Sequence, residues 1–166
     1  MKAGILSDTH DRLDAADAAL ALFLSEKVDI VLHLGDVCTP GILAGFLESG
    51  IPLIGVFGNN DYDRAGLQEA TGGAFREGPT SRVLGERSVL MAHSYRELQP
   101  ELEGRPGFDL VLFGHTHRSM TMRVGKTLVI NPGETCGLTQ GKATCAVVDL
   151  ETMEARIVEI PLPGER

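Results

Sequence analysis

Five apolar runs in this sequence are each followed at once by residues that bind metal ions in proteins. The polar residues at the five ends are Asp8 with His10, Asp36, Asn59, His93, and His115 with His117. Carboxylate and imidazole donors together suit divalent ions such as Mn²⁺, Fe²⁺ and Zn²⁺. The pattern therefore predicts a metal centre where the ends of buried strands converge, with Asp36 from the central strand bridging two ions.

Most of these residues have another interpretation when taken singly. Asp8 and Asp36 could cap helices that follow strand-to-helix turns. Asn59 could be a turn residue, and His93 could be a core histidine with satisfied hydrogen bonds. Cap and turn roles do not explain the whole ordered set, so the two-metal interpretation is favoured. His33 lies inside its run, and we expect it to be structural and to hydrogen-bond a neighbour of the site.

The first half of the chain alternates between strand and helix patterns. We predict strands at 2–6, 28–36 and 52–57 and a helix at 13–27 after an Asp11 N-cap. A second helix is predicted to begin at Pro40 after a Thr39 cap and to be stopped by Gly50. The side chains predicted to face inward are Leu13, Ala16, Leu20, Phe23 and Leu24 in the first helix, and Ile42, Leu43, Phe46 and Leu47 in the second. This alternation predicts parallel strands with their ligand residues at one edge of a sheet.

The second half is richer in antiparallel signals. Gly-X pairs predict type II′ hairpins at 82–92 and 120–130, and a further hairpin spans 143–160. A short helix at 94–103 precedes a loop with Pro106-Gly107 and a buried strand at 110–113. The chain is thus predicted to be a single α/β domain, residues 1–166, with two mixed sheets packed face to face and helices outside. Residues 61–78, and the segment 94–108 that includes this short helix, are expected to be the loop regions that set specificity.

Composition bounds the class of protein. The chain has 166 residues and a formal net charge of −8, which disfavours non-specific binding to nucleic acid. No apolar run approaches the roughly 20 residues of a membrane span, and the N-terminus lacks the anatomy of a signal peptide. The three cysteines, Cys38, Cys136 and Cys145, form no C-x-x-C pair and are expected to be reduced thiols in a cytoplasmic protein. For Cys38 we favour a role as a small buried residue over a role at the site.

The ordered motifs resemble those of the calcineurin-like metallophosphoesterase superfamily, and in particular its small bacterial and archaeal phosphodiesterase branch. They are Ser-Asp-Thr-His at 7–10, Leu-Gly-Asp at 34–36, Gly-Asn-Asn-Asp at 58–61, the isolated His93, and Gly-His-Thr-His at 114–117. The resemblance implies a four-layer α/β/β/α sandwich and a dinuclear site, commonly active with manganese; iron, zinc, nickel and cobalt are the alternatives. It assigns Asp8, His10, Asp36 and His117 to one ion, and Asp36, Asn59, His93 and His115 to the other.

Such a site predicts a phosphoesterase, most simply a phosphodiesterase. Two divalent ions carry four positive charges and the two carboxylates carry two negative ones. The site therefore keeps about two positive charges, which suit a phosphate ester. A hydroxide bridging the ions would attack phosphorus in line, with Asp36, Asn59 and His93 contributing through the metals and through phosphate positioning. We expect the substrate to be a small-molecule phosphate ester.

Three positions depart from the family pattern. Asn60 stands where many members have a histidine that protonates the leaving group, and an amide does not supply that proton. Ser94 follows His93 where glycine is common, and Glu134 follows Asn131-Pro132-Gly133 where serine is common. The last two departures bear on pocket shape and substrate choice.

Other functions remain open from sequence. A phosphomonoesterase or nucleotide pyrophosphatase would use the same metals. A non-catalytic scaffold is the rival of another class, because a retromer subunit shares this fold, although every expected ligand is retained here. A homo-oligomer through an edge strand or hairpin is also open.

Overall fold

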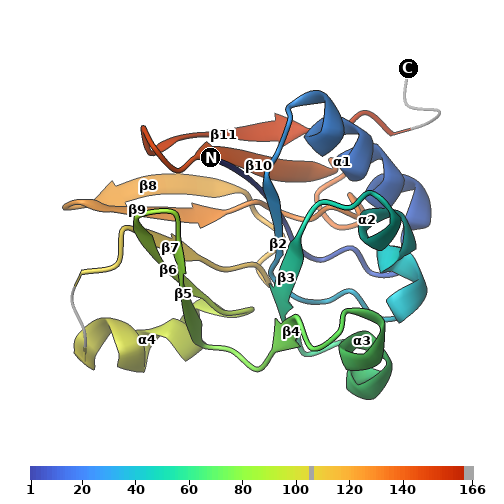
Figure 1. The fold of residues 1–166 in the computed structure, drawn as a ribbon, viewed down its shortest axis with the longest axis horizontal. Coiled ribbons are helices and arrows are strands. Elements are labelled where there is room, and N and C mark those ends of the chain that lie inside the picture. Colours follow the sequence, from blue (N-terminus) through green and yellow to red (C-terminus); the bar gives the residue numbers. More distant parts are fainter. Residues whose placement is uncertain (105–106, 163–166) are drawn as a thin grey trace.

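Two β-sheets lie face to face in the computed structural model of this protein, which describes residues 1–104 and 107–162 (Figure 1). The six-stranded sheet has the order β11 (Glu154–Glu159), β10 (Thr144–Asp149), β1 (Lys2–Leu6), β2 (Ile30–His33), β3 (Leu53–Val56), β4 (Phe75–Arg76). The five-stranded sheet has the order β5 (Thr80–Leu84), β6 (Arg87–Met91), β7 (Leu110–Leu112), β9 (Thr127–Asn131), β8 (Met120–Val124). This is the predicted pair of mixed sheets.

Helices cover the outer face of each sheet and complete four layers. Those on the six-stranded sheet are α1 (Leu13–Ser25), the 3₁₀ helix η1 (Pro40–Leu43), α2 (Ala44–Glu48) and α3 (Arg64–Ala70). On the five-stranded sheet, α4 (Tyr95–Gly104) buries Leu98 against strands β6, β7 and β9. The predicted α/β/β/α sandwich is thereby confirmed.

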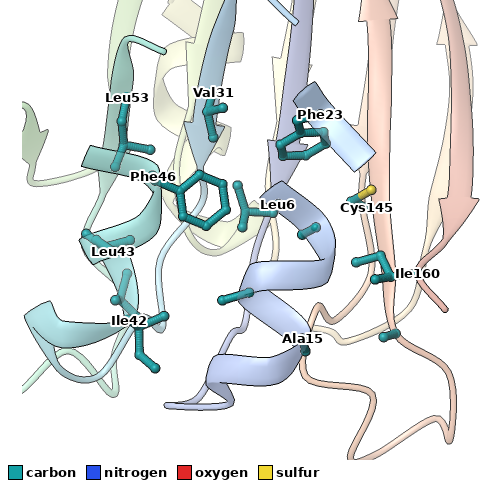
Figure 2. Close-up of a cluster of buried hydrophobic side chains, with 14 of the residues drawn as sticks. Leu6, Ala15, Phe23, Val31, Ile42, Leu43, Phe46, Leu53, Cys145 and Ile160 are labelled. Carbon is teal, nitrogen blue, oxygen red and sulfur yellow. The ribbon is translucent and has the colours of Figure 1, made fainter. Parts of the chain in front are cut away.

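Successive side chains of a strand point to opposite faces of the sheet, and this divides the core into separate apolar layers. In β1, Ile5 packs between the two sheets, whereas its neighbour Leu6 packs under the helices. Figure 2 shows this outer layer, in which Phe23 of α1 and Phe46 of α2 approach the six-stranded sheet. The ring of Phe23 lies over Gly4, where an added Cβ would come within 2.9 Å of it. Both faces of the central strands are therefore apolar, as parallel strands require.

The pairing of strands puts the predicted site at a shared edge. Strands β1, β2 and β3 pair in parallel, and so do β6 and β7 in the other sheet. The carboxyl ends of these strands therefore carry the loops that begin after Leu6, His33, Val56, Met91 and Leu112. All five of the predicted ligand-bearing ends arise in this way.

Both type II′ hairpins and the C-terminal hairpin form as predicted. Strands β5 with β6, β8 with β9, and β10 with β11 pair antiparallel. Gly85 and Gly125 each have a φ of +60°. Glu86 and Lys126, which follow them, do not have a positive φ, and this combination is that of a type II′ turn. The predicted helix at 94–103 is present as α4, one residue further along the chain. Pro106, in the loop predicted to follow it, lies outside the described residues.

Three leucines predicted to face inward lie at the surface instead. Leu13, Leu24 and Leu47 are 51%, 50% and 40% exposed. In α1 the buried stripe runs through three alanines and Phe23, because close approach to the sheet selects small side chains at the centre of the contact. Helical periodicity correctly identified a buried face but placed its centre too far toward the leucines.

The predicted N-cap of α1 was also wrong. The capping position is Arg12, and it makes no side-chain capping bond. The Asp11 carboxylate instead accepts hydrogen bonds from the backbone N–H and the hydroxyl of Thr39, at 2.9 and 2.7 Å. The aspartate thus joins the loop after β1 to the loop after β2, a long-range contact that the local cap pattern does not show.

Residues 61–78 were predicted to be a loop but contain α3 and β4. Asp63 caps α3 by accepting a hydrogen bond from the backbone N–H of Gly66 at 2.9 Å. After the helix, Phe75 of β4 is fully buried beside Gly55 of β3. Because both elements are short, their formation depends on the burial of Phe75 more than on local propensity.

Within the described residues, no helix combines the length and the apolar character needed to cross a bilayer.

Candidate metal centre

The seven residues predicted as ligands come together at the shared edge of the two sheets. Asp8 and His10 follow β1, Asp36 follows β2, and Asn59 follows β3. His93 follows β6, and His115 and His117 follow β7. A continuous series of contacts no longer than 3.9 Å joins all seven side chains. Residues as far apart in sequence as Asp8 and His117 therefore form one cluster.

One part of the cluster surrounds the Asp8 carboxylate. The Nε2 atom of His117 lies 3.4 Å from Asp8 Oδ1, and His10 Nε2 lies 3.9 Å from the same oxygen. The rings of His10 and His117 are stacked with their centroids 5.2 Å apart. The three residues offer ligand atoms that all lie within 4.8 Å of one another, close enough to hold one cation.

The other part surrounds His93. Its Nε2 atom lies 3.4 Å from Asp36 Oδ2, 3.0 Å from Asn59 Oδ1 and 3.2 Å from His115 Nδ1. Asp36 Oδ2 is also 3.6 Å from His10 Nε2. One carboxylate oxygen is therefore shared by the two halves of the cluster.

Two atoms of the first group are buried without a hydrogen-bond partner among the described residues. They are Asp8 Oδ1 and His10 Nε2. Burying an anionic oxygen without a donor costs free energy, and a cation between these atoms would satisfy both. The donor set therefore fits a divalent metal ion.

Electrostatics in the cluster follow from burial and from close pairing. Burial raises the pKa of Asp8, and it outweighs the nearby His93 and His117. Burial would also raise the pKa of Asp36, but contacts with His93 and Asn60 outweigh it and hold this pKa well below its usual range. For His93, the pairing with Asp36 overcomes the opposing effect of burial and raises the pKa to about 9. Binding of a cation here requires His93 to lose that proton.

The backbone around the ligands is held in conformations that L-residues avoid. Five of the seven have a positive φ: Asp8 (55°), His10 (43°), Asp36 (58°), His115 (66°) and His117 (61°). Left-handed backbone costs about 1–2 kcal/mol for each such residue. Hydrogen bonds between loops hold these turns, including those from Asp8 N to Gly35 O (3.0 Å) and from His10 N to Asp36 O (3.1 Å). Strain concentrated at one place is typical of functional sites.

The glycine before Asp36 is required by a close approach. Gly35 has a φ of +96°, and a Cβ there would lie 2.6 Å from the Gly58 nitrogen and 2.8 Å from Nδ1 of His93. Gly114 has a similar role between the sheets, since a Cβ would overlap the hydroxyl of Ser7 and approach Asp8 Oδ2 to 2.9 Å. Glycine at these positions lets the strand ends of both sheets meet.

His33 makes the contacts expected of a structural residue. It is fully buried, and burial lowers its pKa to about 3, so the imidazole is neutral. Its Nδ1 atom accepts a hydrogen bond from the Gly35 backbone N–H at 3.1 Å, which leaves Nε2 to donate to the Thr9 hydroxyl at 3.2 Å. Thr9 in turn donates to the carbonyl of Asp36 at 3.3 Å. The expected hydrogen bond to a neighbour of the site is therefore present.

Sequence reasoning missed two buried carboxylates that support the site. Asp61, 3% exposed, accepts hydrogen bonds from the backbone N–H groups of Asp36 (3.0 Å), Cys38 (2.8 Å) and Gly58 (2.6 Å). Glu134, fully buried, contacts His117 Nδ1 at 2.5 Å. The Gly-Asn-Asn-Asp motif included Asp61, and the unusual glutamate after Asn131-Pro132-Gly133 was a signal for Glu134.

All three cysteines are free thiols. Cys136 and Cys145 are buried, and burial raises the pKa of each to about 12. Cys38 is half-buried with a pKa raised to about 11, chiefly by burial, and its Sγ lies 3.7 Å from His10 Nδ1. It therefore packs beside a candidate ligand as a neutral thiol.

Comparison with known proteins agrees with this geometry. The profile of the calcineurin-like phosphoesterase superfamily domain matches residues 1–153. The chain belongs to this superfamily. It is therefore a metal-dependent phosphoric ester hydrolase, and the phosphoesterase architecture accounts for the convergence of strand ends described above.

Individual relatives cover almost the whole phosphoesterase chain. A phosphodiesterase of Methanocaldococcus jannaschii is 34% identical over 161 residues, which is 94% of this chain and 97% of that protein. The solved structure of an archaeal phosphodiesterase has a TM-score of 0.87 and 32% identity, and the match covers 96% of this chain and 99% of the other. Vacuolar protein sorting 29 from Cryptosporidium parvum matches with a TM-score of 0.64, 17% identity and 95% coverage of both chains, a likeness of fold alone.

Replacing Asp61 by asparagine tests its role in holding the site. An amide has one acceptor oxygen, and its NH₂ group would face a backbone N–H that now donates to the carboxylate. We expect Asp61→Asn to lower the free energy of unfolding by about 1–3 kcal/mol, measured by urea denaturation. Asp63→Asn is the matched control, because asparagine caps a helix as well as aspartate does, and its stability should change by less than about 0.5 kcal/mol. Equal stability of both variants and the wild type would contradict this role.

Proposed function

We propose that the protein is a cytoplasmic phosphodiesterase with two divalent metal ions, most simply Mn²⁺, bridged by Asp36. One ion would be held by Asp8, His10, Asp36 and His117, and the other by Asp36, Asn59, His93 and His115. The observation that carries the proposal is the position of Asp36 Oδ2, which lies 3.6 Å from His10 Nε2 and 3.4 Å from His93 Nε2. The two histidines belong to different halves of the cluster.

Bound divalent ions would supply an activated water and would neutralise charge on the phosphate. The chain supplies the remaining features of such a site. Asp8 and Asp36 are nearly fully buried, so their orientation is fixed by the surrounding strand ends. His93 and Asn59 lie side by side on the half of the cluster where a phosphate oxygen would be positioned. Preorganised charge of this kind stabilises the transition state without reorganisation.

The names given to related proteins support the choice of phosphodiester substrates. Both the curated relative at 34% identity and the solved structure with a TM-score of 0.87 are named phosphodiesterases. We infer a small-molecule phosphate ester rather than nucleic acid, because the chain has a net charge of −8. The cytoplasm is inferred from three free thiols, which fit a reducing compartment.

The side chain at the position of the missing acid makes hydrogen bonds to Asp36 and Tyr62. The backbone N–H of Asn60 donates to Asp36 Oδ1 and its side-chain amide donates to Asp36 Oδ2, both at 2.8 Å. Its carbonyl oxygen accepts a hydrogen bond from the Tyr62 hydroxyl at 2.9 Å. Asn60 thus orients Asp36 and offers no proton to a departing oxygen.

Hydrolysis of a chromogenic aryl phosphodiester by metal-stripped protein tests the proposed function. Addition of Mn²⁺ should restore turnover, and Asp36→Asn should reduce it by more than about 100-fold, beyond the usual cost of losing a residue that only orients a ligand. Asp17→Asn, an exposed aspartate on α1, should keep wild-type activity. Wild-type protein that binds Mn²⁺ but hydrolyses no aryl diester would contradict the proposal and favour a scaffold. Preferential hydrolysis of the aryl monoester would indicate a phosphomonoesterase.

The leaving group should control the rate, because Asn60 provides no general acid. A series of phosphodiesters with leaving groups of increasing pKa should show steeply falling kcat, with aryl esters much faster than alkyl esters. In Asn60→His the dependence should become shallower and alkyl turnover should rise by about 10²-fold, the low end of general acid catalysis. Unchanged alkyl turnover in Asn60→His would show that the missing acid lies elsewhere.

A further inference from the structure

Among the described residues, the Glu134 carboxylate contacts three hydrogen-bond donors and one imidazole nitrogen. It lies in the loop after β9 and is fully buried. Its partners are the backbone N–H groups of Thr139 (2.7 Å) and Gln140 (2.5 Å) on Oε1, and His117 Nδ1 (2.5 Å) and the Cys136 thiol (3.6 Å) on Oε2. Three donors on the two oxygens favour the ionised carboxylate, which only accepts hydrogen bonds.

An acceptor at this place decides which nitrogen of His117 carries the proton. Because Glu134 Oε2 only accepts, the proton of the neutral imidazole must lie on Nδ1. Nε2 then has its lone pair free, and it lies 3.4 Å from Asp8 Oδ1. The Thr139 hydroxyl, 3.2 Å from Nδ1, can accept from the same N–H. The ring is thereby fixed with its ligand atom toward the cluster.

We propose that Glu134 is a positioning residue, which fixes the tautomer and orientation of His117 so that Nε2 binds the metal ion shared with Asp8 and His10. The proposal rests on the proposed function for the identity of that ion. Metal-binding histidines commonly donate their other N–H to a carboxylate, which fixes the ring and raises the basicity of the ligand atom. Here the carboxylate occupies the position at which the family pattern has serine.

Glu134 is not itself placed as a ligand. Glu134, His117 and Cys136 offer donor atoms within 4.8 Å of one another, so a separate metal site is the alternative. However, each carboxylate oxygen already faces two donors, and a cation at Oε2 would displace the His117 N–H contact at 2.5 Å. The loop at 137–141 therefore holds Glu134 for His117.

Glu134→Gln keeps the shape of the side chain and removes one acceptor. Two backbone N–H groups face Oε1, so the amide oxygen should stay with them and the NH₂ group should turn toward His117. Nδ1 would then have to accept, which moves the imidazole proton to Nε2 and blocks the ligand atom. We expect the affinity for the first Mn²⁺ to fall by about 10- to 100-fold.

The tautomer can be measured without any metal or substrate. In metal-free, ¹⁵N-histidine-labelled protein at a pH where the imidazole is neutral, long-range ¹H–¹⁵N correlation spectra distinguish the two protonated nitrogens. His117 should carry its proton on Nδ1 in the wild type and on Nε2 in Glu134→Gln. Free Mn²⁺ measured by EPR during titration gives the affinities of both proteins. Glu159→Gln, an exposed glutamate paired with Lys142, is the control for loss of charge and should keep the wild-type affinity.

A proton on Nε2 of wild-type His117 would overturn the inference, and this result does not depend on whether the variant folds. Unchanged Mn²⁺ affinity in folded Glu134→Gln would overturn it as well. Thr139→Val distinguishes the effect of the Thr139 hydroxyl from that of the Glu134 carboxylate. It removes the hydroxyl near His117 but keeps the backbone N–H that donates to Glu134. The Mn²⁺ affinity of this variant should stay within about threefold of wild type. Wild-type protein with the expected tautomer and affinity but no turnover would leave the inference standing and refute the proposed function instead.

Discussion

The structure depends on two carboxylates, Asp8 and Asp36, that are buried at the meeting point of two sheets. An anion removed from water is costly unless positive charge or hydrogen-bond donors compensate it. Asp36 receives N–H donors from Asn60 and pairs with His93, whereas Asp8 Oδ1 has no partner among the described residues. The imidazole nitrogens of His10 and His117 lie 3.9 and 3.4 Å from this oxygen. A cation held between them would offset the cost of burying it.

The sandwich is what makes such a gathering possible. Parallel pairing brings the ends of β1, β2 and β3 to one edge, and the second sheet brings the ends of β6 and β7 against them. Contacts between the loops then cross large sequence separations, as in the hydrogen bond from the His115 backbone N–H to Asp8 Oδ2 at 3.1 Å. Rigid strands below the loops hold the left-handed conformations that would relax in an isolated segment. The pairing of strands thus accounts for the geometry of the site.

Sequence alone was sufficient wherever a local pattern carries the information. Apolar runs that end in Asp, Asn or His predicted the five strand ends, and Gly85 and Gly125 predicted two hairpins. Prediction failed where the outcome depends on distant contacts. The exposure of Leu13 follows from how closely α1 approaches the sheet, and Asp11 bonds to Thr39 rather than to its own helix. Residues such as Glu134 become recognisable only when His117 is known to lie beside them, although the departure from the family pattern had already singled out this position.

EPR of the Mn²⁺-loaded protein tests whether Asp36 joins two metal ions into one centre. Two Mn²⁺ ions that share a carboxylate oxygen are magnetically coupled, so their hyperfine lines are more closely spaced than those of an isolated ion. If Asp36 bridges the ions, the wild type should give this coupled spectrum at two Mn²⁺ per chain, and Asp36→Asn should give only isolated Mn²⁺. Saturation of the wild type at one ion per chain, or two uncoupled ions, would show that Asp36 does not bridge them.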